Sequence, residues 1–95
     1  MKFRALALWD IDDVVDYYEK IREGLGAKFL AQLEATFTRI EDNPRAYAVV
    51  HKDVRLASLR RFPYIVVYRL EGAAPLVLAV THNKRRSSVW KSRLN

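Results

Sequence analysis

The chain has 95 residues, of which 51% are hydrophobic and 12% aromatic, and its net charge is +6. This length and composition predict one folded domain, residues 1–95, and exclude a disordered chain. With no cysteine and only two histidines, disulfides and thiolate zinc sites are excluded and a histidine metal site is disfavoured, so we expect no metal and no cofactor.

The first residues resemble the start of a signal peptide, because the basic residues Lys2 and Arg4 lie beside an apolar run. That run ends at Asp10 and falls short of the roughly 7–15 apolar residues of a secretory signal. No stretch approaches the ~18 apolar residues of a membrane span. We therefore expect a cytoplasmic protein with no membrane partner.

The segment Lys2–Leu8 alternates with a period of two, which predicts a first strand. Asp10 is then expected to cap a helix, with Asp12 and Asp13 in its first turn, where carboxylates complement the helix dipole. The sequence Gly24-Leu25-Gly26 interrupts the helical pattern and predicts a turn.

A second helix is predicted from about Ala27 to Asp42, because its apolar residues recur at helical spacing and Asn43-Pro44 ends the pattern. Two helices joined by so short a turn form a helical hairpin. Its apolar faces need another layer to cover them.

Three strand-like segments follow the hairpin. Val54–Phe62 and Tyr64–Leu70 are rich in β-branched and aromatic residues, and Glu71–Pro75 is typical of a hairpin loop. Leu76–Thr81 is apolar on both faces, which places it inside the sheet. The predicted order is β-α-α-β-β-β, an α+β fold with a helical hairpin packed on a sheet.

Charge is distributed unevenly along the chain. Residues 1–44 carry six Lys/Arg and nine Asp/Glu, whereas residues 45–95 carry eleven and two. This asymmetry indicates an anionic partner for the second half, which is nucleic acid, an acidic protein segment or both. The alternative interpretation is an ordinary solubilising surface.

A series of short motifs runs from residue 43 to residue 90. In order they are Asn43-Pro44, Asp53-Val54-Arg55, Leu59-Arg60-Arg61-Phe62-Pro63-Tyr64, Val67-Tyr68-Arg69, Val80-Thr81-His82 and Trp90. In this order and spacing they resemble the ParE/RelE toxin superfamily of type II toxin–antitoxin systems, and most closely its ParE-like plasmid-stabilisation branch. The resemblance implies a curved, mainly antiparallel sheet and a cognate acidic antitoxin. Where the family often has Arg-Asp-Pro before the tryptophan, this chain has a more basic segment, residues 83–89.

The resemblance implies a toxin that arrests growth by binding and poisoning a nucleic-acid machine, with DNA gyrase as the target. The first alternative is a RelE-like endoribonuclease that cleaves messenger RNA on the ribosome, and the second is a member that has lost toxicity. RNA cleavage needs groups that move protons and cations that stabilise developing charge. His82 could move protons, but RelE-type enzymes commonly use a tyrosine near the C-terminus, and the tail has none. The tail therefore favours the binding poison.

The candidate target-binding surface is basic and lies in one turn and in the tail. Its residues are Arg60, Arg61, His82, Lys84, Arg85, Arg86, Trp90, Lys91 and Arg93. If the segment around Arg60 and Arg61 is extended, these side chains point to opposite faces and only one can join the surface. A structural role, at the strand end for His82 and over the core edge for Trp90, is the interpretation that we favour for each. No residue is assigned a catalytic role.

Overall fold

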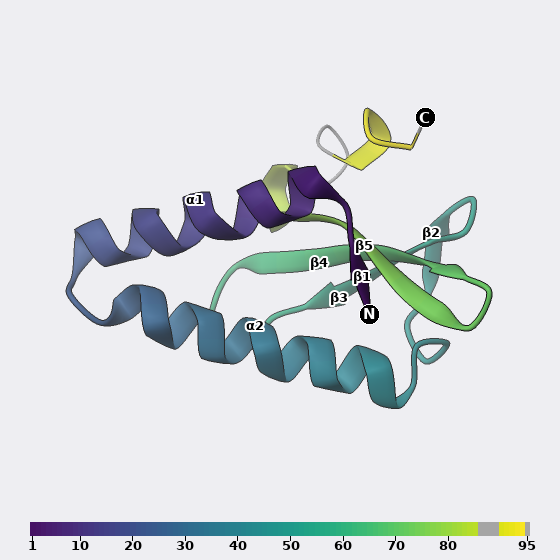
Figure 1. The fold of residues 1–95 in the computed structure, drawn as a ribbon, viewed down its shortest axis with the longest axis horizontal. Helices are drawn as coiled ribbons and strands as arrows, with labels where there is room; N and C mark the ends of the chain where they lie inside the picture. Colours follow the sequence, from purple (N-terminus) through teal and green to yellow (C-terminus); the bar gives the residue numbers. More distant parts are fainter. Residues whose placement is uncertain (86–89, 95) are drawn as a thin grey trace.

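Five strands form one sheet in the computed structural model, which describes residues 1–85 and 90–94 (Figure 1). Their order across the sheet is β1-β5-β4-β3-β2, with β1 parallel to β5 and every other neighbouring pair antiparallel. The strands are β1 (Lys2–Phe3), β2 (Val49–His51), β3 (Val54–Ser58), β4 (Tyr64–Glu71) and β5 (Ala74–His82). The mainly antiparallel sheet and the internal position of the last strand are therefore confirmed.

Two antiparallel helices, α1 (Ala5–Ile21) and α2 (Leu25–Asp42), cover one face of this sheet (Figure 1). Phe29, Leu33 and Ile40 of α2 are fully buried against the sheet side chains, since burial of apolar surface is the main term that stabilises such a layer. The hairpin depends on its glycines. Gly24 has a φ of 87°, and a Cβ on Gly26 would lie 2.8 Å from the Val15 carbonyl oxygen. The predicted α+β fold with a helical hairpin on the sheet is confirmed.

The predicted first strand is wrong beyond its first two residues. Only Lys2–Phe3 is a strand, and α1 already begins at Ala5. Ala7 and Val14, one helical repeat of seven residues apart, are both buried, so burial follows the helical period rather than the alternation. Asp10 is consequently not a helix cap, and Asp12 and Asp13 do not lie in the first turn.

The strands after the hairpin also differ from the sequence prediction in two places. A short strand, β2, precedes β3 and was not expected. The strand expected to run from Val54 to Phe62 ends at Ser58, because the chain bends there and Arg61 adopts a left-handed φ of 69°.

The second face of the sheet is covered by the end of the chain. Alternate β4 residues, Ile65 and Val67, point away from the helices and form a separate buried cluster with Leu78 and Trp90. Trp90 is only 4% exposed. Strand β5 is therefore buried on both faces, by α1 on one side and by Trp90 and Leu94 on the other. No helix among the described residues is long and apolar enough to cross a membrane.

Candidate functional site: the basic end of the sheet

One end of the sheet gathers the cations of the β3–β4 turn and those that follow β5. The Leu59 N–H donates to the Tyr64 carbonyl oxygen at 2.9 Å, and the Asn83 N–H donates to the Pro63 carbonyl oxygen at 2.9 Å. These bonds hold the turn with Arg60 and Arg61 beside the short helix η1 (Asn83–Arg85). The turn is not extended, so the expectation that the two arginines point to opposite faces of a strand does not apply, and both are exposed.

His82 lies at the end of β5 between Tyr64 and η1. Its ring centroid is 5.3 Å from that of Tyr64, in an edge-to-face arrangement. The Lys84 N–H donates to Nδ1 of His82 at 3.2 Å. Because Nδ1 accepts a hydrogen bond, the neutral imidazole carries its proton on Nε2 and can donate from there.

A hollow of about 550 Å³ lies between α1 and this end of β5. The residues around it are Asp10, Asp13, Val14, Tyr17, Tyr64, Val80, Thr81, His82, Lys84 and Arg85. Burial is the main cause that raises the pKa of Tyr64; nearby Tyr17 raises it further and the Arg85 guanidinium lowers it. Two tyrosines therefore share this hollow with the histidine and two cations.

The sequence prediction placed Tyr17 and Tyr64 in helix and strand and gave them no role in the site, because neither lies in the basic tail. Equal steps outward from the Glu71–Ala74 pair would bring Tyr64 opposite Thr81, and only a register shift between Val67 and Tyr68 brings it opposite His82, so the sequence carries no local signal for this pair. Tyr17 comes from α1, and no local pattern links it to β5.

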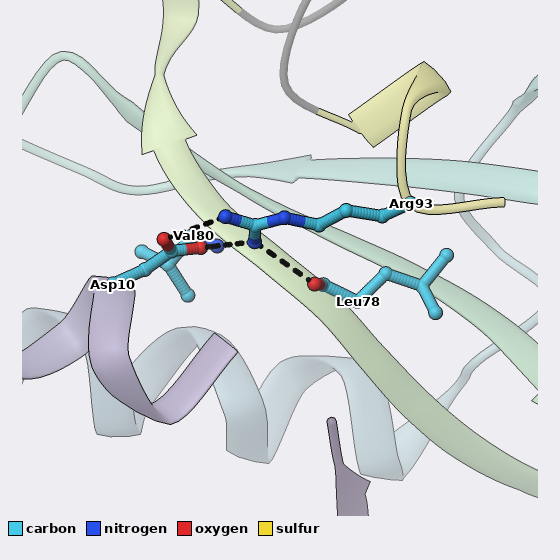
Figure 2. A network of polar contacts seen from close by, with 4 residues as sticks. All are labelled: Asp10, Leu78, Val80 and Arg93. Atoms are coloured by element: carbon cyan, nitrogen blue, oxygen red, sulfur yellow. Dashed lines mark hydrogen bonds and ion pairs between the residues drawn. The ribbon is translucent and has the colours of Figure 1, made fainter. Parts of the chain in front are cut away.

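Arg93 is directed into the molecule rather than toward solvent (Figure 2). Its guanidinium binds both carboxylate oxygens of Asp10, at 2.6 and 3.0 Å, and also donates to the Leu78 carbonyl oxygen at 3.2 Å. Asp10 accepts in addition from the Val80 N–H at 3.0 Å. Since β1 pairs with only Leu76 and Val77, this ion pair satisfies the part of the β5 edge that no strand covers.

The remaining predicted site residues divide between surface and interior. Lys84, Arg85 and Lys91 are exposed, and the Lys91 ammonium lies 5.8 Å from the centre of the Trp90 ring. Trp90 is buried and so has the structural position that we favoured for it. Arg86 lies outside the described residues.

A second feature that the sequence prediction missed is apolar. Leu6, Leu8 and Trp9, in the first two turns of α1, are 55, 49 and 69% exposed. Of these three, Leu6 lines a hollow of about 590 Å³, together with Arg4, Ala5, Leu78, Ser92 and Arg93. The sequence prediction did not identify the three exposed side chains, because it assigned residues 2–8 to a strand. Among the described residues no group of three or more histidines and carboxylates is arranged to hold a metal ion.

The chain is similar to a known protein family and to solved structures. A family model described as "ParE toxin of type II toxin-antitoxin system, parDE" matches residues 1–87. Among solved structures, a chain from "Chromosomal ParDE TA system from P. aeruginosa" superposes with a TM-score of 0.74 at 20% sequence identity. The superposition covers 85% of this chain and 91% of that one, and at this identity it supports the fold alone. No curated protein matches the sequence.

Proposed function

Because the chain belongs to the ParE toxin family of type II toxin–antitoxin systems, we propose that it poisons DNA gyrase by binding rather than by cutting nucleic acid. The observation that carries this proposal is the collection of exposed cations, Arg60, Arg61, Lys84 and Arg85, at one end of the sheet. A surface of one sign steers association with an anionic target and needs no reactive group. Gyrase bound to DNA offers such a target.

The proposed neutralising partner is an acidic antitoxin. ParE toxins pair with ParD antitoxins, and a chain of net charge +6 with exposed Leu6, Leu8 and Trp9 offers both features that an acidic, partly apolar segment would cover. A partner that binds only the folded toxin also raises its stability by mass action. We expect the melting temperature of the toxin to rise with saturating antitoxin, and an unchanged temperature would contradict this part of the proposal.

The target is tested by comparing two double variants in a gyrase supercoiling assay. Arg60→Glu/Arg61→Glu reverses two charges on the basic end, whereas Lys20→Glu/Lys28→Glu reverses two on the exposed side of the hairpin. Interface charges that steer association are worth roughly tenfold or more in rate at low salt, so the first variant should lose inhibition and the second should keep it. Equal loss in both, with folding intact by circular dichroism, would contradict the proposal, as would wild-type toxin that leaves gyrase unaffected.

The endoribonuclease alternative is favoured by one observation, the proximity of Tyr64 and Tyr17 to His82. Removing a general acid or base typically lowers a rate by ~10²–10⁴. The alternative therefore expects His82→Ala to abolish growth arrest and expects transcripts cut at ribosome-positioned sites in wild-type cells. The gyrase proposal expects the variant to retain most of its toxicity and the transcripts to stay intact.

A further inference from the structure

The hollow between α1 and the end of β5 is lined by charged groups of both signs. Lys84 and Arg85 supply positive charge from η1, and Asp13 supplies a carboxylate from α1. The other carboxylate at the hollow, Asp10, is already held by Arg93 at 2.6 Å. A ligand that satisfies both kinds of group needs an anionic group for the cations and a hydrogen-bond donor for the carboxylate.

Two aromatic rings line the same hollow, Tyr17 from α1 and Tyr64 from β4. Tyr17 is 57% exposed, although a tyrosine ring left in water loses the benefit of burial. Tyr64 is half-buried and fixed by the rings of Phe29 and His82, whose centroids lie 5.5 and 5.3 Å away. One ring is thus open to a planar ligand and the other is a rigid wall, an arrangement typical of base stacking.

The size and the donors of the hollow also fit a small aromatic anion. Its volume of about 550 Å³ falls within the usual range for small-ligand sites. Nδ1 of His82, which also lines the hollow, is occupied by the Lys84 N–H, so Nε2 is left as a donor. Phosphate oxygens accept readily from such donors and from lysine and arginine.

We propose that this hollow binds one nucleotide unit, with the base against Tyr17, an amino group of the base donating to Asp13, and the phosphate beside Lys84 and Arg85. The inference does not depend on gyrase being the target and involves no cleavage. An acidic peptide fits less well, because its carboxylates would face Asp13 and would leave the rings unused. A free nucleotide and a nucleotide within a single strand present the same chemistry.

The test is a titration of the ¹⁵N-labelled full chain, followed by NMR, with AMP, UMP, a ten-residue adenine oligonucleotide and a decaglutamate peptide. We expect amide shifts at Tyr17, Thr81 and His82 with AMP and with the oligonucleotide, and weaker binding of UMP, whose base has no amino group. Shifts with AMP alone identify free nucleotide as the source, and tighter oligonucleotide binding identifies a strand. Nucleotide-induced shifts confined to other surfaces, or decaglutamate binding at this hollow as tightly as the oligonucleotide, would overturn the proposal.

Paired variants separate stacking and charge from folding. Tyr17→Ala should weaken oligonucleotide binding by roughly 5- to 100-fold, whereas Tyr17→Phe, which keeps the ring, should bind nearly as the wild type does. Lys84→Gln should weaken binding and reduce its dependence on salt by about one phosphate contact, and Lys28→Gln on α2 should change neither. Tyr17 and both lysines are exposed, so these variants keep the fold. Equal affinities for Tyr17→Ala and Tyr17→Phe would exclude the stacking role.

Discussion

Replacement of Asp10 by alanine removes three hydrogen bonds at the uncovered edge of β5. One comes from the Val80 N–H at 3.0 Å, and two come from the Arg93 guanidinium at 2.6 and 3.0 Å. The side chains of Arg93 and Asp10 are only 17 and 18% exposed, so water replaces these bonds poorly. The variant leaves a partly buried guanidinium without its counterion and a strand N–H without its acceptor.

The expected loss of stability follows from these contacts. Removing one partner of a fully buried ion pair costs about 3–5 kcal/mol, and an orphaned N–H adds about 1 kcal/mol. Because this pair keeps some exposure, we expect Asp10→Ala to lower the free energy of unfolding by about 2–4 kcal/mol. For a domain of this size that corresponds to a melting temperature lower by roughly 10–25 °C. A loss of this size is a large part of the ~5–15 kcal/mol that stabilises a typical domain.

Urea unfolding followed by circular dichroism measures this loss in a double-mutant cycle. Arg93→Ala should cost less than Asp10→Ala, because Asp10 keeps the Val80 N–H as a partner. The double variant should be more stable than the sum of the single losses implies, by about 1 kcal/mol or more. The exposed pair of Lys2 and Glu71, 4.0 Å apart, is the matched control, and Glu71→Ala should change stability by at most about 0.5 kcal/mol. This reasoning would be refuted if the losses of the two single variants added up to the loss of the double variant. It would also be refuted if Asp10→Ala lost no more stability than Glu71→Ala.

Three further predictions concern the core, the hairpin and the imidazole. Burial raises the pKa of Tyr68 to about 12, and its hydroxyl donates to the Pro44 carbonyl oxygen at 2.7 Å. Because the folded pKa lies above the unfolded value of about 10, this contribution to stability is complete below pH 10 and is lost between pH 10 and 12. Tyr68→Phe should lower the free energy of unfolding by about 1 kcal/mol at pH 7. In urea unfolding between pH 10 and 12, the variant should also lose less of its stability than the wild type does. Gly26→Ala should lower the melting temperature despite the better helix propensity of alanine, because its Cβ would lie 2.8 Å from the Val15 carbonyl oxygen, and a stabilised variant would show that the helices can separate at little cost. His82→Ala, once circular dichroism has shown that it is folded, should still arrest growth. A folded variant that does not arrest growth would count against poisoning by binding.

Much of the fold was predictable because it depends on local properties of the chain. Gly24 and Asn43-Pro44 bound the second helix, which begins at Leu25, two residues before the predicted start, and includes Gly26. Apolar residues on both faces of Leu76–Thr81 placed that strand inside the sheet. The error at Lys2–Leu8 arose because a short apolar run fits both a strand and the first turns of a helix. Only burial of Ala7 on the same face as Val14 distinguishes the two.

The candidate site was predicted in part. The sequence indicated a basic second half, and Arg60, Arg61, Lys84 and Arg85 do lie at one end of the sheet. It did not indicate that Tyr17 faces this end, because an exposed aromatic residue on a helix carries no mark of the strand beside it.

By itself, the sequence determined the helical hairpin, the strands that follow it except β2, the internal strand and the basic second half, because periodicity, turn residues and charge act over a few neighbouring positions. Only the tertiary structure decided which cations remain at the surface. Asp10 and Arg93 are 83 residues apart and meet because β1 ends early and leaves part of the β5 edge to be satisfied. Trp90 lies in a basic part of the sequence but has an apolar side chain. It is buried because it covers apolar side chains on the sheet face opposite the helices. These pairings depend on unmet hydrogen bonds and uncovered apolar surface, which exist only once the sheet has formed.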